Sequence, residues 1–427
     1  MGFQWKRPRS PSPGVADVEP AYGPEESLEE LAELAGGAGA EVLDRMVQSR
    51  SAPEAATLIG SGKVEELRAR LEGLAANLVL FDHNLTPMQQ RNLERELGVK
   101  VVDRTQLILD IFARRARTRE GHLQVELAQL NYLLPRLAGH GVEMSRLGAG
   151  IGTRGPGETK LETDRRRIFR RIRRIGEQLE AVRQSRARQR TKRVAVPLDT
   201  VALAGYTNAG KSTLFNALTG AGVLESPRLF ATLDPTLRVL ELPSRRRALI
   251  SDTVGFIRNL PTTLVEAFRA TLEEVREAAL ILHVVDLASP HSREQARQAE
   301  KVLHEIGAAS RQRLLVLNKI DRIEEPERAA RIQAEKAAWR NNPVAAVSAL
   351  TGEGIPGLLQ MLDCSPALQP VAAARFRFAV GEGSEISFLH QHAQVLETNY
   401  SGEEVEVCAA VSEAVRKRLR RRLVKEA

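Results

Sequence analysis

Residues 205–212 read GYTNAGKS, a complete match to the phosphate-loop pattern G-x-x-x-x-G-K-[ST]. The apolar run TVALAG before it predicts a β-strand, and TLFNALTG after it predicts a helix. In a strand–loop–helix unit of this kind, the glycines let backbone N–H groups wrap the phosphates of a nucleotide. Lys211 can neutralise the β- and γ-phosphates, and the Ser212 hydroxyl can ligate Mg²⁺. The stretch therefore predicts an α/β domain that binds a nucleotide.

Three more polar motifs each follow a predicted strand. DTVG at 252–255 offers the Asp252 carboxylate to the Mg²⁺ shell and the Gly255 N–H to the γ-phosphate. NKID at 318–321 offers Asp321, which can accept hydrogens from guanine N1 and its 2-amino group, whereas adenine offers neither. VAAVSA ends at Ser348 and Ala349, which suit a backbone contact with guanine O6. Four motifs in this order predict a doubly wound, mostly parallel sheet that binds GTP at the carboxyl ends of its strands.

The segment PRLFATLDPTLRVLEL at 227–242 contains the candidates for a γ-phosphate switch. Thr232 and Thr236 could each reach Mg²⁺ when GTP is bound and release it when phosphate leaves. The residue chemistry alone does not choose between them. Asn208 leaves a second alternative open, because its amide oxygen could either hold K⁺ beside the phosphates or brace the loop.

A second glycine stretch, GIGTRG at 150–155, matches the dinucleotide pattern G-x-G-x-x-G, but no predicted strand leads into it. Heptad-spaced apolar residues precede and follow it, and they predict an antiparallel helical hairpin whose second helix runs from about Thr159 to Arg190, about 48 Å. A glycine-rich tip with Arg146 and Arg154 suits RNA phosphates. The seam residues are Leu123, Leu127, Leu130, Leu134 and Leu137 before the loop and Ile168, Ile172, Ile175, Leu179 and Val182 after it.

The positive charge of the chain is concentrated in the second hairpin helix. The 427 residues carry a net charge of +8, but residues 165–193 hold thirteen Lys and Arg against two acids, a net +11. Like charges at this spacing weaken a helix, so we expect them to contact a polyanion. We expect no membrane span or secretory signal, and the two cysteines predict no disulfide framework or zinc site.

Elsewhere the pattern predicts two small domains. Between residues 27 and 117, strands at 41–48, 77–82 and 99–103 alternate with helices, which indicates a parallel sheet covered by helices. The Gly60–Lys63 stretch GSGK lacks the full phosphate-loop pattern and is interpreted as a helix start. The expected organisation is a disordered tail (1–25), an N-terminal α/β subdomain (26–118), a helical hairpin (119–195), a GTP-binding domain (198–366) and a small C-terminal α+β domain (373–427).

The motifs GYTNAGKS, FATLDPT, DTVGFI and NKID, together with residues 91–130 and GIGTRGPGETKLE at 150–162, resemble the HflX family of translational GTPases. The match extends from roughly Glu26 to Asp363. One departure is Ala149, where many members have glycine. The resemblance implies binding to the large ribosomal subunit through rRNA contacts of the 146–193 hairpin, and the splitting of stalled or idle 70S ribosomes. It also implies that Thr232 is the Mg²⁺ ligand in a switch formed by 230–234.

The resemblance and the motifs together define the expected site. GTP or GDP and Mg²⁺ are the expected cofactors, with K⁺ as a candidate. Lys211, Thr232, Gly255 and Asn208 are expected to act in catalysis, and Ser212, Thr232 and Asp252 to hold Mg²⁺, the last through water. The expected nucleotide-binding residues are Gly205, Tyr206, Thr207, Asn208, Ala209, Gly210, Lys211, Ser212, Phe230, Ala231, Thr232, Leu233, Asp234, Asp252, Thr253, Val254, Gly255, Asn318, Lys319, Ile320, Asp321, Ser348 and Ala349.

We expect a monomeric cytoplasmic GTPase that meets membranes only through ribosomes and hydrolyses GTP slowly without them. Two alternatives remain. The protein could be a ribosome-assembly or RNA-modification GTPase that acts on free RNA, or an RNA-binding or unwinding module regulated by nucleotide.

Overall fold

The computed structural model describes residues 2–5, 23–139, 156–193, 198–220, 230, 235–244, 246–258, 269–340, 342–368, 372–411 and 413–426. The chain forms two compact units. The N-terminal unit comprises Met1–Glu180, Pro227–Phe230 and Asn259–Phe268, and the C-terminal unit comprises the remainder. The hairpin tip at 140–155 and the switch residues 231–234 lie outside the described residues.

Short strands alternate with helices in the first part of the N-terminal unit, as the sequence predicts. β3 (Leu78–Phe81) and β4 (Lys100–Asp103) pair in parallel, and their apolar side chains form a core with the helices around them. Thr86 begins α3 with a reciprocal capping box to Gln89. The helices are α1 (Pro24–Gly37), α2 (Ser61–Leu74), α3 (Pro87–Leu97) and α4 (Arg104–Arg115).

Two details of this part differ from the sequence prediction. The strand expected at 41–48 forms only from Val47 to Arg50, as β2, because the charges at 41, 44 and 45 break the alternation that a strand requires. Residues 2–5, expected to belong to a disordered tail, form β1 (Gly2–Trp5), which pairs in parallel with β2. Aromatic residues at alternate positions favour a strand there, and the partner strand lies far along the chain.

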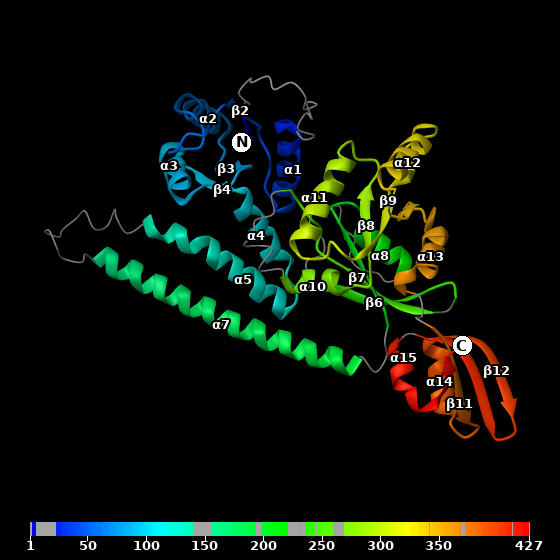
Figure 1. Cartoon of the computed structure of the whole chain (residues 1–427). Helices are drawn as coiled ribbons and strands as arrows, with labels where there is room; N and C mark the ends of the chain where they lie inside the picture. Colours follow the sequence, from blue (N-terminus) through cyan, green and yellow to red (C-terminus); the bar gives the residue numbers. More distant parts are fainter. Residues whose placement is uncertain are drawn as a thin grey trace, which may run out of the picture. The chain divides into compact units, whose positions relative to one another are not determined.

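Two helices follow and lie side by side (Figure 1): α5 (Arg119–Leu133) and α7 (Pro156–Arg193). Between them, η1 (Leu134–Gly139) continues from α5. Ile175 and Leu179 of α7 are buried against Leu123 of α5. An ion pair joins Arg171 to Glu126, with Nε 2.6 Å and Nη2 2.7 Å from the carboxylate oxygens. The apolar contact between these helices thus includes Leu123, Ile175 and Leu179 of the predicted seam, with Leu127 and Leu130 partly buried against them.

The C-terminal unit has a six-stranded sheet in the order β10-β9-β8-β5-β7-β6. All pairs are parallel except β6 with β7, so β6 is an antiparallel edge strand. Helices α8 and α13 contribute to one apolar cluster, and α11 and α12 to another. The predicted fold class, a doubly wound α/β domain beside smaller domains, is confirmed.

The strands and helices of this region follow in chain order. They are β5 (Thr200–Gly205), α8 (Lys211–Thr219), β6 (Thr236–Glu241), β7 (Arg247–Asp252), α10 (Arg269–Glu277), β8 (Leu280–Asp286), α11 (Ser292–Glu305), β9 (Gln312–Asn318), η2 (Ile320–Arg322), α12 (Glu327–Ala338), β10 (Val344–Ala346), α13 (Ile355–Asp363) and η3 (Pro366–Leu368).

The last part of the chain is an antiparallel sheet in the order β12-β13-β11-β14. Two of its four strands have no clear pattern in the sequence, because β12 reads QVLETNYS without a clear alternation and β14 follows directly on a basic run. The elements are β11 (Ala372–Ala379), α14 (Gly383–His392), β12 (Gln394–Ser401), β13 (Glu404–Val411), α15 (Glu413–Arg418), η4 (Arg420–Arg422) and β14 (Leu423–Glu426). Over the described ranges, no helix has the length and apolar character to cross a membrane.

Candidate nucleotide-binding site

The phosphate loop connects the end of β5 with the start of α8. Three of its residues have left-handed or otherwise positive φ: Gly205 at 152°, Asn208 at 61° and Gly210 at 89°. A Cβ on Gly205 would lie 2.2 Å from the Val284 carbonyl oxygen, so the close approach of β5 to β8 requires glycine. The loop geometry thus depends on both glycines of the motif, and it opens the carboxyl end of β5 to a ligand.

The Lys211 side chain is buried inside this loop. Its ammonium donates to the carbonyl oxygens of Tyr206 at 2.8 Å and Gly205 at 3.2 Å. Burial lowers the pKa of Lys211 to about 8, although the nearby Asp252 carboxylate acts in the opposite direction. A phosphate anion beside the ammonium would stabilise its charged form. The environment of Lys211 therefore favours an anionic ligand.

Gly255 lies next to this ammonium. A Cβ at position 255 would come within 2.9 Å of Lys211 Nζ and 2.8 Å of Thr207 Cγ2. A side chain here would displace the lysine or the loop. The absence of one lets the Gly255 backbone approach the place where the γ-phosphate is expected.

Ser212 and Asp252 supply adjacent oxygen atoms. Ser212 Oγ donates to Asp252 Oδ2 at 2.8 Å, and Asp252 is fully buried at the end of β7. A hydroxyl and a carboxylate oxygen at this separation match the hard oxygen ligands that Mg²⁺ prefers. These two side chains fit a Mg²⁺ ion that would bridge the loop and the phosphates.

Asn318 connects the phosphate loop to the loop after β10. Its Nδ2 donates to the Ala209 carbonyl at 2.9 Å, and its Oδ1 accepts from the Ala349 N–H at 3.0 Å. The side chain is almost completely buried. A single amide therefore links the phosphate loop to the segment that is predicted to contact the base, two segments that the sequence alone places only at neighbouring strand ends.

The NKID segment presents its aspartate to solvent. Lys319 has φ 64°, and its ammonium pairs with Asp286 Oδ2 at 2.7 Å. Asp321 is the second residue of η2, and its side chain is exposed and accessible to a base. Asp286, the partner of Lys319, is not among the residues predicted from the sequence. It ends the apolar run LILHVVD of β8, so the rule that identified the other strand-end carboxylates would have identified it too.

The residues after DTVG are attached to the phosphate loop by backbone hydrogen bonds. The Thr207 N–H donates to the Phe256 carbonyl at 2.7 Å, and the Phe256 N–H donates to the Gly205 carbonyl at 3.0 Å. The Arg258 N–H donates to the Tyr206 hydroxyl at 2.9 Å. Phe256 is only 2% exposed, so a buried ring occupies the position at which many GTPases have a polar glutamine.

The predicted switch is described only at its margins. Ala231, Thr232, Leu233 and Asp234 lie outside the described residues, so the role of Thr232 stays a prediction. Thr236 is the first residue of β6 and lies opposite Asp252 in the strand pairing. Phe230 is assigned to the N-terminal unit, where it is almost completely buried.

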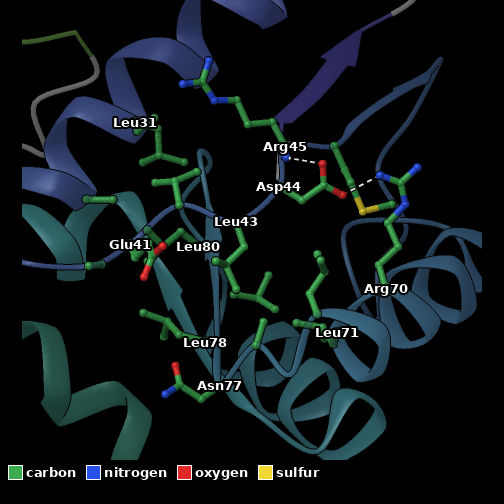
Figure 2. Close-up of a pocket in the computed structure, with 18 of the residues that line it drawn as sticks. Leu31, Glu41, Leu43, Asp44, Arg45, Arg70, Leu71, Asn77, Leu78 and Leu80 are labelled. Carbon is green, nitrogen blue, oxygen red and sulfur yellow. Dashed lines mark hydrogen bonds and ion pairs between the residues drawn. The ribbon is translucent and has the colours of Figure 1, made fainter.

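A cavity of about 430 Å³ lies in the N-terminal unit, between α1, α2, β3 and the segment before β2 (Figure 2). Its lining combines apolar side chains such as Leu71, Leu78 and Leu80 with polar ones, among them the ion pair between Asp44 and Arg70 (Figure 2). It contains none of the phosphate- or guanine-binding motifs. The candidate nucleotide site remains the set of strand ends around β5, where the predicted motifs lie.

Comparison with protein families gives three consecutive matches. Residues 25–113 match the family described as GTP-binding GTPase N-terminal, and residues 115–193 match GTP-binding GTPase Middle Region. Residues 200–319 match the family described as 50S ribosome-binding GTPase. The third match includes the phosphate loop, DTVG and the first two residues of NKID.

Full-length relatives show the same similarity. The chain is 48% identical over 396 residues to the protein named GTPase HflX of Caldanaerobacter subterraneus subsp. tengcongensis, which covers 93% of this chain and 90% of that protein. It is 56% identical over 297 residues to GTPase HflX of Alkalihalophilus pseudofirmus, covering 70% of each. It is 49% identical over 337 residues to GTPase HflX of Escherichia coli (strain K12), covering 79% and 78%.

Proposed function

Because the chain belongs to the HflX family of GTPases, with a domain of the ribosome-binding GTPase family, we propose that it uses GTP to bind the large ribosomal subunit and to split stalled or idle 70S ribosomes. The observation that carries this proposal is the coexistence of two features in one chain. Asn318 aligns the phosphate and guanine segments, and α7 presents a row of exposed arginines.

The site residues have distinct roles in this proposal. Lys211 binds the β- and γ-phosphates, and the loop glycines bring backbone N–H groups to them. Asp321 recognises guanine, and the Ala349 segment contacts O6. Ser212, Asp252 and Thr232 would hold Mg²⁺, which when bound neutralises charge on the phosphates. Gly255 places its N–H against the γ-phosphate, and Thr232 leaves when that phosphate is lost.

Hydrolysis is slow in the free protein because Phe256 cannot orient a water molecule. Its ring is buried and has no hydrogen-bonding group. The missing contribution comes from the ribosome, from a reordered switch or from a cation such as K⁺. A GTPase of this kind is active mainly on its target, which suits a switch.

The hairpin supplies the affinity for rRNA. Where the structure describes α7 side chains, its arginines are exposed, and Arg171 is the one that pairs with an acid of another element, Glu126. A polyanion would neutralise their mutual repulsion and release counterions. The exposed arginines of α7 include Arg165, Arg166, Arg167, Arg170, Arg173 and Arg174. We propose that the protein acts in the cytoplasm as a monomer.

Sedimentation distinguishes this proposal from its alternatives. The protein, loaded with a non-hydrolysable GTP analogue, is run on sucrose gradients with 70S ribosomes and with isolated subunits. We expect it to sediment with the large subunit and to convert 70S particles to free subunits. Binding to free RNA or to assembly precursors alone would favour an assembly or modification GTPase. Strand separation of RNA without ribosome binding would favour an unwinding module.

A further inference from the structure

The phosphate loop contains a buried hydroxyl group to which the fold gives no hydrogen-bond partner. Thr207 lies between Tyr206 and Asn208 and is 5% exposed. Its Oγ1 is shielded from solvent and makes no hydrogen bond to any of the described residues. Burying a hydroxyl without a partner costs free energy, so folded proteins rarely leave one in this condition. In a binding loop, such a hydroxyl is a candidate ligand contact.

Backbone hydrogen bonds fix the position of this threonine. The Thr207 N–H donates to the Phe256 carbonyl at 2.7 Å, and the Phe256 N–H donates to the Gly205 carbonyl at 3.0 Å. The carbonyls of Gly205 and Tyr206 accept from the Lys211 ammonium. The polar backbone groups around the hydroxyl are therefore engaged with other partners. They hold Thr207 between the phosphate loop and the segment after β7, and they leave its hydroxyl for another group.

The side chain of Thr207 meets Gly255 and Lys211 at one point. A Cβ added to Gly255 would lie 2.8 Å from Thr207 Cγ2 and 2.9 Å from both Thr207 Cα and Lys211 Nζ. The Gly255 N–H and the Lys211 ammonium are the groups expected to contact the γ-phosphate. The threonine side chain therefore adjoins the place assigned to that phosphate. Threonine populates more than one χ1 rotamer, so its hydroxyl can turn to the position that the methyl group holds.

The charge of the neighbourhood favours an anion as the missing partner. A hydroxyl can donate or accept a hydrogen bond, but near the Lys211 ammonium it most readily donates to an oxygen that the cation also attracts. The phosphate oxygens of GTP meet this condition. GDP has no γ-phosphate, so a contact made there distinguishes the triphosphate from the diphosphate.

We infer that the Thr207 hydroxyl donates a hydrogen bond to the γ-phosphate of GTP and so helps the protein to distinguish GTP from GDP. The phosphate-loop pattern leaves position 207 unspecified and assigns its side chain no role. Phe256 offers no polar side chain to the same phosphate, whereas Thr207 offers one from the loop. The inference rests on the nucleotide site of the proposed function and does not depend on the ribosome.

Two substitutions separate the hydroxyl from the rest of the side chain. Thr207→Val replaces the hydroxyl with a methyl group of similar size, whereas Thr207→Ser keeps it. Affinities of the full chain for a non-hydrolysable GTP analogue and for GDP are measured by competition with a fluorescent GDP. In Thr207→Val we expect the ratio of analogue affinity to GDP affinity to fall about tenfold, as for a lost hydrogen bond to a charged group. GDP affinity should stay within about twofold of wild type, and Thr207→Ser should keep the ratio within the same margin.

The stability of the free protein gives a second readout, which a structural role of the hydroxyl would move in the opposite direction. Thr207→Val removes a buried polar group without a partner, so we expect it to raise the midpoint of urea denaturation. Ser365→Ala is the matched control. The Ser365 Oγ is also buried without a partner among the described residues, and it lies outside the nucleotide motifs. This control should raise the urea midpoint too, but it should leave the affinity ratio unchanged.

Three results would overturn the inference: an unchanged affinity ratio in Thr207→Val, an equal loss of the ratio in Thr207→Ser, or a lower urea midpoint in Thr207→Val. The last result, which includes failure of the variant to fold, would mean that the hydroxyl stabilises the fold. If the wild type bound neither nucleotide, the proposed function and the inference would both be wrong. If the wild type binds both nucleotides and Thr207→Val keeps the ratio, the inference alone fails.

Discussion

The hydroxyl of Ser212 donates a hydrogen bond to the carboxylate of Asp252 over 2.8 Å. The two residues come from different elements, the start of α8 and the end of β7, and forty positions separate them. Parallel strands bring their carboxyl ends to one edge of the sheet, so the phosphate loop and DTVG meet there. The negative charge of Asp252 is buried beside this hydroxyl, and a divalent cation is the ligand that best compensates it.

Replacing Asp252 with asparagine should remove the negative charge of the side chain while keeping its size and shape. Asparagine keeps an oxygen that can accept from Ser212, but it removes the charge that attracts Mg²⁺. We expect GTP hydrolysis to fall about 100-fold and the Mg²⁺ concentration for half-maximal rate to rise, because electrostatic stabilisation at such sites is worth several kcal/mol. Hydrolysis is followed by phosphate release across a Mg²⁺ titration. An unchanged Mg²⁺ dependence would remove Asp252 from the cation site.

Asp321→Asn should change the base preference. The carboxylate accepts two hydrogens from guanine, and asparagine instead offers one acceptor and one donor, which match the N1–H and O2 of xanthine. The loss of GTP affinity should be about 1–3 kcal/mol, in the range of charge-assisted hydrogen bonds, with a gain for the xanthosine nucleotide. Nucleotide affinities are measured by competition with a fluorescent GDP. Unchanged GTP affinity in this variant would rule out Asp321 as the guanine reader.

The candidate site was largely predictable because its residues follow from local pattern. Each motif stands at the end of an apolar run, and parallel strands place such ends together. The contacts of Asn318 and the pairing of Lys319 with Asp286 were not predictable, because they depend on the register of β8 and β9. The assignment of Phe230 to the N-terminal unit was also not predictable, because local residue spacing does not indicate a contact between positions 112 and 230.

The small sheets were harder to predict than the GTP-binding sheet for a related reason. Antiparallel β12 carries polar residues at both faces, and β1 pairs with a strand more than forty residues away. Strands of this kind are stabilised by their partners and not by their own alternation. Buried parallel strands such as β8 and β9 are continuous apolar runs, which single-sequence patterns detect readily.

Charge reversal at Arg170 and Arg174 tests whether the hairpin binds RNA. Both side chains are exposed on α7. Each lost phosphate contact should reduce the slope of log affinity against log salt by about one, because fewer counterions are released. Affinity for large subunits is measured over a range of KCl concentrations. An unchanged slope and affinity would mean that these arginines form an ordinary solvated helix face.

Arg171 requires separate treatment in that experiment. It belongs to the same basic run, but its guanidinium pairs with Glu126 of α5, so reversing it alone would also disrupt the hairpin. The exchange of both charges, Arg171→Glu with Glu126→Arg, keeps the pair and the total charge. We expect this double variant to bind large subunits better than Arg171→Glu alone.

His283 should make the GTP-binding domain sensitive to acid. It is 1% exposed on β8, its ring packs against Trp339, and neither ring nitrogen has a hydrogen-bond partner among the described residues. Burial lowers the pKa of His283 from 6.5 to about 4, and the positive charges of Arg313 and Lys211 add to the effect. In the unfolded chain His283 therefore binds a proton below pH 6.5, whereas in the folded chain it binds one only below about pH 4.

Protonation of His283 leaves the free energy of unfolding unchanged above pH 6.5 and lowers it as the pH falls from 6.5 toward 4. Between pH 8 and pH 5 the free energy of unfolding should fall by about 2 kcal/mol from this residue. Urea denaturation at the two pH values, in the wild type and in His283→Leu, isolates the effect, because other groups titrate equally in both. An equal pH dependence in the two proteins would contradict the assignment.

The side chain at position 256 offers no polar group that could take part in GTP cleavage. Phe256 is buried beneath the phosphate loop, so the attacking water lacks the glutamine that many GTPases use. Asn208 offers a substitute. Its backbone is left-handed at φ 61°. A side chain that braces the loop would need a hydrogen bond to it, and the Asn208 side chain makes none to the described residues. An amide oxygen in this position can hold K⁺ beside the β- and γ-phosphates.

We expect turnover without ribosomes to be about tenfold faster in K⁺ than in Na⁺, because a positioned cation stabilises the charge that develops in the transition state. Asn208→Gly tolerates the left-handed backbone and removes the amide, so it should abolish the K⁺ effect while GDP still binds. Asn208→Asp keeps an oxygen ligand and should retain part of it. Rates are measured in matched K⁺ and Na⁺ buffers, with and without large subunits. Fast turnover in Na⁺ alone would show that the buried phenylalanine is no handicap and that hydrolysis needs neither a cation nor the ribosome.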